Sequence, residues 1–494
     1  MSEPQQGLTG APSAQTIEKP AEPVMWDRIV EQTRLSRERT RDLVNEFAEQ
    51  VLQGSMTVSK DAEAMINARI AQIDRLLSVQ LNEVLHKPEF QKLEASWRGL
   101  RYLLDQSETS TMLKIKVLNV SKKDLLRDLQ RAPEFDQSQL FKKIYEEEFG
   151  TFGGEPFGAL VGDYEFGRHP EDMELLDRVS KVAAQAHAPF LTAASPDLLN
   201  LDSFTKLGNI RDLATVTNTL DYAQWKSLRA SEDSRYLGLC LPHILMRLPY
   251  GKATKSVEAF QYEEGVDGTD HSKYLWGNAA WALGARLTNA FALYGWTTAI
   301  RGVQGGGLVK GLPTHTFRTD EGDVALKCPT EVAITDRRDK ELSDQGFISL
   351  VHCKNTDYAA FFAAQSVQKP KLWSTDAANA SARLSAQLPY LLAVSRFAHY
   401  LKAIMRDRIG SFMSREDCER TLNEWITLYV TPDPTALPSV KASHPLQEAR
   451  VEVSEVPGKP GVYRAIAHLR PHFQLDELNV SLRLVAELPK STRG

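Results

Sequence analysis

The sequence predicts a mixed α/β protein in three parts, because its apolar residues follow two different periods along the chain. Through the middle, short apolar runs typical of buried strands are interleaved with runs of helical period, which indicates a mainly buried sheet covered by helices. A charged region poor in apolar residues precedes this part, and helices followed by strands come after it. We therefore expect a helical amino-terminal arm over residues 1–58, an α/β domain over 59–375 and an α+β domain over 376–494.

The amino-terminal arm is predicted from its shortage of large apolar residues. Residues 1–24 are rich in Pro, Gln, Ser and Ala, and cannot bury enough surface to offset their ordering entropy, so we expect them to be disordered or bound to a partner. Residues 26–53 are typical of a charged helix with apolar residues only late in its length. That stripe is too thin to pack into a core of its own chain. Its members are Leu43, Val44, Phe47 and Val51.

Two helices, a strand and a third helix are expected at the start of the middle domain. Apolar residues at helical spacing from Ile66 to Val84 predict a helix that ends before Pro88, and PEFQKLEASWRGLRYLLDQ predicts the next. In TMLKIKVLNV, apolar residues alternate with two lysines, which is the period of a half-buried strand. Ser121 and Asp124 then stand at capping-box spacing and predict a helix start.

The buried sheet is predicted from five short apolar runs. Between them, the apolar stretch 278–300 carries Arg286 and many alanines and glycines, so we expect a buried core helix there and no membrane span. The runs that predict strands are GALVGDYEF, APFLTAAS, RYLGLCL, TEVAIT and GFISLVH.

The carboxy-terminal domain is predicted to begin with helices, in LPYLLAVSRFAHYLKAIMRDRIG and CERTLNEWITLYV, and to end with strands. QEARVEVSEV and GVYRAIAHLR, joined by PGKPG, predict a hairpin, and NVSLRLVAEL predicts a third strand. Three short strands leave two open edges, which monomeric proteins normally cover or blunt. A strand from another chain would complete such a sheet, so we expect an assembly.

Composition excludes several classes of function. The 494 residues carry a net charge of -5, which leaves no basic excess to hold nucleic acid. The four cysteines include no CxxC pair, which indicates a reducing compartment and no structural zinc. The amino terminus has no basic region followed by an apolar run, so we expect no secretory signal. We expect a cytoplasmic protein without a bound metal or cofactor.

The glycine-rich run 302–311 raises the alternative of a cytosolic α/β nucleotide-binding enzyme. Gly306 and Gly311 have phosphate-loop spacing, but Leu312 and Pro313 stand where lysine and a hydroxyl are required. The dinucleotide pattern fails as well, because it needs glycine at Lys310. An apolar helix precedes the run where both motifs require a strand. The pattern favours glycines that end a buried helix and thread a tight connection.

The remaining chemistry-bearing residues form no recognisable catalytic constellation. The sequence has no HExxH zinc motif, no GxSxG nucleophile elbow and no cysteine in a nucleophile signature. No catalytic, cofactor-binding or metal-ligating residues are therefore assigned, and we expect a protein that is not an enzyme.

Several long blocks together resemble the large sheath subunit of bacterial type VI secretion systems, the TssC, VipB or EvpB family. The resemblance runs from about Leu43 to the end of the chain. The terminal YRAIAHLRPHFQLDELNVSLRLVAELP is similar to the family's carboxy-terminal domain, which is related to contractile phage tail sheaths. The other blocks are FQKLEASWRGLRYLL, SQLFKKIYEEEFG, GALVGDYEFG, RYLGLCLPHILMRLPYG, LWGNAAWALGARL, IRGVQGGGLVKGLP and CPTEVAITDRRDKELSDQGFISLVHCKNTDYAAFF.

The resemblance implies a structural subunit. It implies pairing with a small sheath subunit (TssB/VipA) and stacking with neighbouring copies around an inner tube of Hcp on a baseplate. Contraction would then propel the tube and its effectors out of the cell, and the AAA+ ATPase ClpV would act on the contracted sheath. No nucleic acid and no direct membrane insertion are expected.

The resemblance also implies strand exchange. An amino-terminal arm of one subunit would join a small sheet built on the carboxy-terminal strands of a neighbour. The acceptor residues carried over to this sequence are Val451, Val453, Ala465, Ala467, Leu469, Val480, Leu482 and Leu484.

Overall fold

The computed structural model divides the chain into two compact units, Met1–Leu77 and Ser78–Gly494, which are described separately. Most of the expected arm over residues 1–58 lies outside the described residues, as does the expected third strand in NVSLRLVAEL. The structure describes residues 42, 45, 46, 49, 62–318, 322–411, 414–457 and 463–474.

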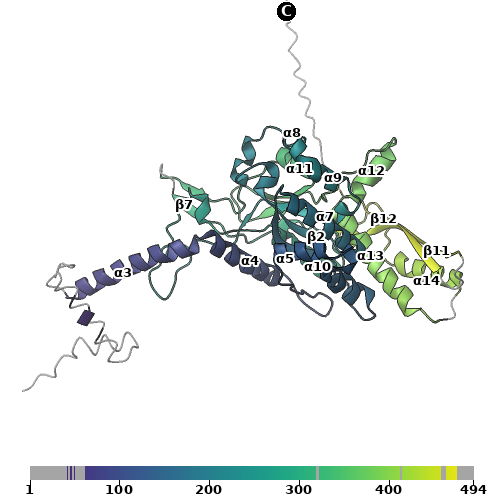
Figure 1. Cartoon of the computed structure of the whole chain (residues 1–494), viewed down its shortest axis with the longest axis horizontal. Helices are drawn as coiled ribbons and strands as arrows, with labels where there is room; N and C mark the ends of the chain where they lie inside the picture. Colours follow the sequence, from purple (N-terminus) through teal and green to yellow (C-terminus); the bar gives the residue numbers. More distant parts are fainter. Residues whose placement is uncertain are drawn as a thin grey trace, which may run out of the picture. The chain divides into compact units, whose positions relative to one another are not determined.

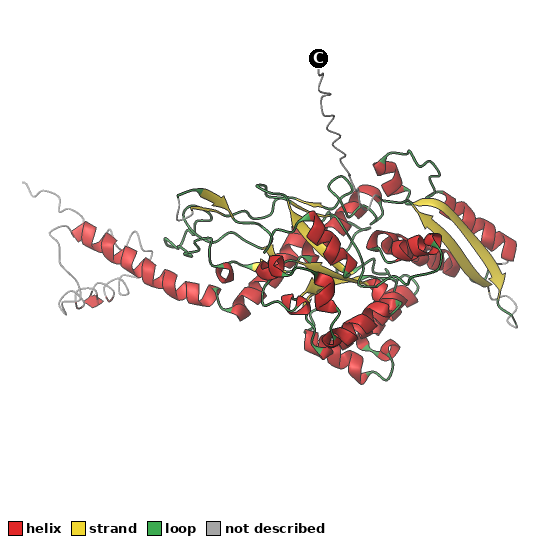
Figure 2. Cartoon of the chain, turned by 90° about the horizontal axis from the view of Figure 1, so that it is seen from above, coloured by secondary structure: helices red, strands yellow, loops and turns green. Residues whose placement is uncertain are grey.

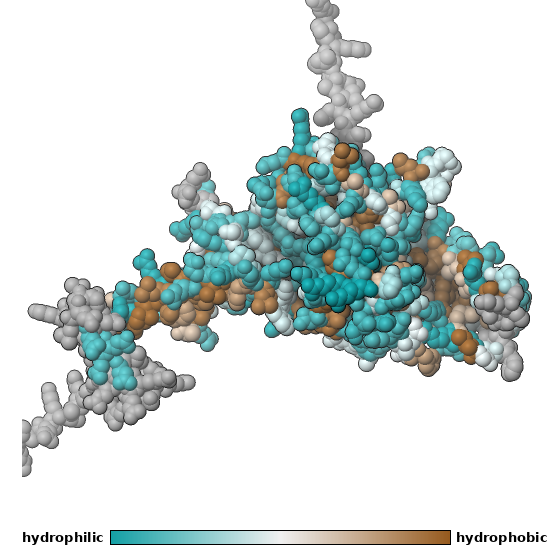
Figure 3. Space-filling view, in the orientation of Figure 1, coloured by the Kyte–Doolittle hydropathy of each residue, from teal (hydrophilic) through white to brown (hydrophobic). Residues whose placement is uncertain are grey.

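The described residues of the first unit include the first part of helix α3 (Ala62–Leu85). The helix is the one expected from the spacing of its apolar residues. Its stripe, however, is not a core stripe, since Ile70, Ile73 and Leu77 are all exposed. Brown side chains gather along α3 in Figure 3, which shows the apolar character of this surface.

The second unit is built on a six-stranded sheet with the order β1-β2-β3-β9-β10-β6. The first four strands are parallel, and β10 is antiparallel to both of its neighbours. Four of the five expected strands are present, as β1, β2, β3 and β9. The bounds are β1 (Leu160–Phe166), β2 (Phe190–Ala194), β3 (Leu237–Leu241), β9 (Phe347–His352), β10 (Ala359–Phe361) and β6 (Leu308–Val309).

Helices cover both faces of this sheet. Successive side chains of a strand point to opposite faces, so each buried strand contributes residues to two separate cores. Leu239 of β3 belongs to one core, whereas its neighbour Cys240 belongs to the other. The first core includes α5, α7, α9 and α11, and the second includes α10 and α13. The bounds are α5 (Lys122–Arg131), α7 (Pro170–Gln185), α9 (Ala223–Ala230), α10 (Ala280–Tyr294), α11 (Asp336–Asp344) and α13 (Leu388–Asp407).

The expected buried helix and helix caps are confirmed. Within 278–300, α10 is buried along most of its length. The Ser121 side chain accepts from the Asp124 N–H at the start of α5. None of the described helices is long and apolar enough to cross a membrane.

Two strand predictions are wrong. TMLKIKVLNV follows helix α4 (Pro88–Asp105) but is neither helix nor strand, and among the described residues no backbone hydrogen bond reaches residues 114–119 to form a ladder. In TEVAIT, only Thr330 forms a single bridge, to Ile244. There the Glu331 side chain bonds to Ser203 and His243, and Thr335 caps α11, so local side-chain contacts replace the strand.

The carboxy-terminal part has the expected helices followed by a hairpin. The two long strands β11 and β12 lie beside α14 in both views (Figures 1 and 2). The bounds are α12 (Asp376–Ser385), α14 (Arg415–Thr427), α15 (Pro438–Ser443), β11 (Leu446–Glu455) and β12 (Tyr463–Pro471).

Short elements complete the described fold: two small antiparallel strand pairs, β4 with β5 and β7 with β8, a π-helical segment and short helical turns. The bounds are β4 (Ile244–Leu245), β5 (Trp276–Gly277), β7 (Thr316–Arg318), β8 (Val324–Leu326), the π-helix Lys142–Gly150, α6 (Gln139–Phe141) and α8 (Leu213–Thr217).

Candidate assembly interface

The hairpin of β11 and β12 has one face in the core and one in solvent. Along β11, Val451 and Val453 are buried, while Glu452 between them is exposed. This alternation is what a half-buried strand requires. The pairing places Val451 opposite Ala467 and Val453 opposite Ala465, so four of the expected acceptor residues share one face of the hairpin.

An aromatic core supports that face. The rings of Trp296 and Phe397 stack with their centroids 4.2 Å apart, and Leu422 and Ile426 of α14 belong to the same cluster. Burial of this much apolar surface holds the hairpin against α13 and α14. The buried residues of the cluster are Trp296, Phe397, Leu401, Cys418, Leu422, Ile426, Leu446, Val451 and Val453.

Side chains of α14 close the outer edge of β11. The Asn423 Nδ2 donates to the Val451 carbonyl at 2.7 Å, and the Val451 N–H donates to Asn423 Oδ1 at 2.9 Å. The Val453 N–H donates to Glu419 Oε2 at 3.1 Å. The amide of Asn423 thus supplies one donor and one acceptor, as a neighbouring strand would. This edge is satisfied within the chain and is protected from strand addition.

The outer edge of β12 has no neighbouring strand among the residues that the structure describes. In an antiparallel pair, successive residues direct their N–H and C=O groups to opposite edges. Since Val451 points toward α14, its neighbours Arg450 and Glu452 bond to β12, opposite His468 and Ile466.

The alternate residues of β12 must therefore present their backbone to the outer edge. These are Ala465, Ala467 and Leu469, three of the expected acceptors. In the part of the chain that the structure describes, no hydrogen bond reaches their N–H or C=O groups.

The solvent face of the hairpin carries a ladder of charges. Arg470 lies 3.8 Å from Glu448, and Glu452 contacts both Arg450 (3.3 Å) and His468 (4.0 Å). Ile466 is exposed among these charges. Exposed pairs of this kind add little stability, but they make the face polar.

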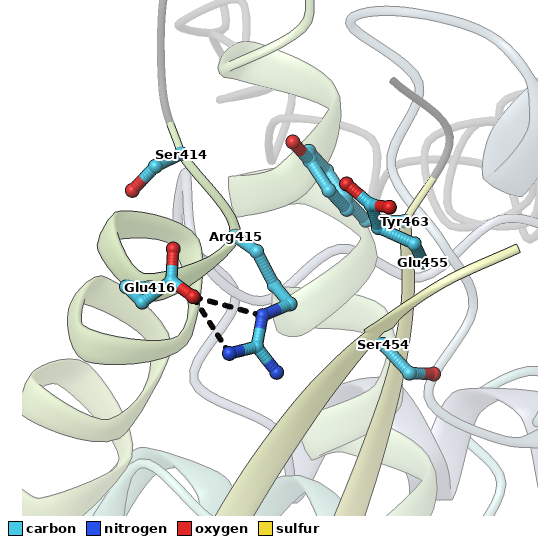
Figure 4. Close-up of a pocket in the computed structure, with 6 residues that line it drawn as sticks. All are labelled: Ser414, Arg415, Glu416, Ser454, Glu455 and Tyr463. Carbon is cyan, nitrogen blue, oxygen red and sulfur yellow. Dashed lines mark hydrogen bonds and ion pairs between the residues drawn. The ribbon is translucent and has the colours of Figure 1, made fainter. Parts of the chain in front are cut away.

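A shallow depression lies at the open end of the hairpin, where β11 and β12 meet the start of α14 (Figure 4). Ser414 and Asp417 form a capping box there. The Arg415 guanidinium donates to Glu416 through Nε (3.1 Å) and Nη2 (2.6 Å), and this pairing raises the pKa of Arg415. The hydroxyl of Ser414 bonds to Asp417, and the guanidinium of Arg415 pairs with Glu416. None of these groups is an activated nucleophile or base.

Backbone groups of the glycine-rich run form hydrogen bonds with one another and with the backbone of Phe361. The Gly302 N–H donates to the Phe361 carbonyl at 2.6 Å, the Phe361 N–H to the Gly307 carbonyl at 3.0 Å, and the Gly307 N–H to the Gly302 carbonyl at 2.9 Å. The run is a tight connection leading into β6, as expected. It does not end the buried helix, because α10 stops at Tyr294 with Gly295 in the left-handed conformation at its C-cap.

At the carboxyl edge of the sheet, where doubly wound folds hold ligands, the ionisable groups are already paired. His243 lies between two carboxylates and forms a hydrogen bond with each. Its Nε2 is 3.2 Å from Glu165 Oε1, and its Nδ1 is 2.5 Å from Glu331 Oε2. Burial lowers the pKa of His243, but the two carboxylates outweigh burial and raise it to about 10. The pairing therefore holds His243 in its charged form. Among the described residues, no group of His, Cys, Asp and Glu could hold a metal ion.

The structure therefore brings five of the eight expected acceptor residues into one hairpin and divides them between two edges. Val480, Leu482 and Leu484 lie outside the described residues. Sequence reasoning missed Asn423 and Glu419, which close the β11 edge. Their spacing of four residues beside the apolar stripe of α14 placed them on one helix face, but the pattern did not indicate their partner.

The chain matches two models of known protein families. The VipB model, described as the EvpB/VC_A0108 tail sheath N-terminal domain, matches residues 67–368. A second, described as the EvpB/VC_A0108 tail sheath gpW/gp25-like domain, matches residues 377–488. The type VI secretion system sheath protein TssC1 of Pseudomonas aeruginosa is 51% identical over 462 residues, which cover 93% of each chain.

Two solved structures are similar at low identity. The baseplate of the anti-feeding prophage has a TM-score of 0.35 at 7% identity, over 64% of this chain and 66% of that one, slightly less than two thirds of its length. The contracted helical sheath of the anti-feeding prophage has a TM-score of 0.32 at 8% identity, over 64% of this chain and 67% of that one.

The two family models define the class, which is that of the tail sheath proteins. The chain belongs to the VipB/EvpB family of type VI secretion system sheath proteins, and the resemblance noted from its sequence blocks is confirmed.

Proposed function

We propose that this chain is the large subunit of the contractile sheath of a bacterial type VI secretion system. In the cytoplasm it pairs with a small sheath subunit (TssB/VipA) and stacks with copies of itself around an Hcp inner tube, starting on a baseplate. Contraction propels the tube and its effectors out of the cell, and ClpV acts on the contracted sheath. The chain performs no catalysis in this function.

The observation that carries the proposal is the asymmetry of the hairpin. Its β11 edge is closed at Val451 and Val453 by Asn423 and Glu419, whereas among the described residues nothing bonds to the backbone of Ala465, Ala467 and Leu469 at the β12 edge. A hairpin with one protected and one open edge accepts a strand at a single edge. Main-chain ladders tolerate rotation of rigid bodies about flexible linkers, so such a joint survives a change of helical pitch.

We assign the donor strand to the amino-terminal arm, residues 1–53, of a neighbouring copy. The alternative of a nucleotide-binding enzyme has no comparable support, because the run 302–311 bonds to its own chain.

Co-expression with a candidate small subunit tests the proposal. We expect hollow tubules with a cogwheel cross-section by negative-stain microscopy. Deletion of residues 1–53 removes the donor and leaves the second unit intact, so the variant is expected to stay folded and form no contraction-competent sheath. A well-behaved monomer indifferent to every small subunit would refute the proposed function, and normal contraction of the deletion variant would refute the assigned donor.

A further inference from the structure

The segment 113–119, here called the lysine segment, is held extended although it forms no strand. The ammonium groups of Lys114 and Lys116 both reach the carboxylates of the 148–155 region: Lys114 bonds to Glu155, and Lys116 bonds to Glu148 and lies 4.0 Å from Glu155. Two residues apart, these side chains share one face, which is the geometry of extended backbone.

The opposite face and the carboxyl end of the lysine segment are also held. Ile115 packs against a small core that contains Leu103 and Trp281. One residue beyond the segment, the Val120 carbonyl accepts from the Tyr164 hydroxyl at 2.8 Å. At residues 114–116 both faces are therefore in contact with the protein, as they would be in a strand of a sheet.

The two edges of the lysine segment are what remain open. Among the described residues, no hydrogen bond reaches the backbone N–H or C=O groups of residues 114–119. Apolar side chains at the same place lie in solvent, with Met112 72%, Val117 66% and Leu118 53% exposed. A fixed row of unpaired backbone groups beside exposed apolar side chains is a template for another strand.

Charge decides which strand fits. Residues 109–123 contain the lysines Lys114, Lys116, Lys122 and Lys123 and no Asp or Glu. Pairing of the segment with its copy would set lysines against lysines, and like charges directly opposite each other are destabilising. Lys114 and Lys116 already pair with Glu155 and Glu148 on one side, but their side chains remain 47% and 44% exposed, so a further carboxylate can reach them from solvent.

We propose that the lysine segment accepts an extended segment of a different polypeptide, in which apolar residues alternate with Asp or Glu. The ladder supplies the backbone bonds, the apolar residues cover Val117 and its neighbours, and the carboxylates meet the lysines. The inference deepens the proposed function, and it rests on that function only in taking this polypeptide to be a partner subunit of the sheath.

A peptide probe tests the chemistry on the full chain. The probe is a labelled, end-capped Thr-Val-Glu-Ile-Glu-Val-Thr peptide, with binding followed by fluorescence anisotropy and by hydrogen exchange of the 113–119 amides. Two controls carry Lys in place of Glu, or methyl groups on alternate backbone nitrogens. We expect both controls to bind at least tenfold more weakly, and residues 113–119 to be protected by the probe alone. Equal binding of all three peptides, or no protection at 113–119, would overturn the inference.

A proline variant separates the edge from the fold. Val117→Pro removes one unpaired N–H, and the matched control Leu372→Pro places proline at another exposed, irregular position. We expect at least a tenfold loss of probe binding for Val117→Pro only, with both melting temperatures near that of the parent. Unchanged binding by a folded Val117→Pro variant would contradict the proposal.

Hydrogen exchange on the assembled sheath decides the matter if Val117→Pro does not fold. Protection of 113–119 in tubules supports the inference. Tubules in which 113–119 still exchange rapidly refute it and leave the proposed function standing. If no tubules form with any small subunit, the proposed function fails, and the peptide measurements alone decide the inference.

Discussion

Asn423 of α14 and Val451 of β11 exchange two hydrogen bonds, so that a side-chain amide takes the place of a neighbouring strand. Both residues are close to the aromatic core that supports the hairpin. This relationship closes the β11 edge at Val451, so the strand addition that we propose is assigned to the β12 edge.

Replacement of Asn423 by Ala should destabilise the second unit by about 1–3 kcal/mol, because a donor and an acceptor of Val451 lose their partners. Urea unfolding measures the change. The control is Glu424→Ala, whose side chain is 71% exposed on the same helix and lies 4.0 Å from Arg420. Equal stability of the two variants would show that the amide does not close the edge.

Proline at two adjacent positions of β12 should have opposite effects. Ala467→Pro removes an N–H from the open edge, so the variant should keep its stability and fail to form tubules. Ile466→Pro removes an N–H that faces β11, and should cost about 1–3 kcal/mol of unfolding free energy. Thermal unfolding and negative-stain microscopy of both variants distinguish these outcomes. Tubules formed by Ala467→Pro would locate strand addition elsewhere.

His399 should make stability depend on pH. Burial, helped by Arg396, His187 and Lys402, lowers the pKa of His399 from 6.5 to about 4, and its Nε2 is 2.8 Å from the Ala186 carbonyl. In the unfolded chain His399 therefore takes up a proton near pH 6.5, whereas in the folded chain it does so only near pH 4. The free energy of unfolding falls as pH drops from 6.5 toward 4. The full effect is about 3 kcal/mol.

Urea unfolding at several pH values measures the contribution of His399 to the pH dependence of the unfolding free energy. His399→Phe removes the titration, so its stability should fall less steeply than that of the parent between pH 6.5 and 4. Other titrating groups act in both proteins and cancel in the comparison. Parallel curves would show that His399 does not contribute.

In the glycine-rich run, a change in side-chain size at Gly306 should reduce stability, whereas removal of the charge of Lys310 should not. Gly306 has a φ of 91°, and a Cβ there would lie 2.1 Å from the Ala299 carbonyl oxygen, so Gly306→Val should cost more than about 2 kcal/mol and reduce soluble yield. Lys310 is exposed, and Lys310→Ala should leave melting temperature and tubule formation unchanged. Loss of assembly by a folded Lys310→Ala variant would revive the nucleotide hypothesis.

Much of the fold was predictable from local patterns. The period of two placed Leu239 and Cys240 on opposite faces of a buried strand, and Ser121 marked the start of α5 through its own side chain. The hairpin and four of the six strands of the main sheet followed from the same signals. These features depend on residues that are neighbours in the sequence, and so the pattern contains the information.

Pairing was decided only by the tertiary structure. Residues 113–119 have the period of a strand, but a strand also needs a second backbone about 4.8 Å away, which their own sequence cannot specify. The same limit applied to Asn423, whose pattern showed a polar helix position and not the Val451 backbone that it bonds. The amino-acid sequence by itself determined the family and the periods of the elements. The arrangement of distant backbones determined which edges are closed and which remain open to another chain.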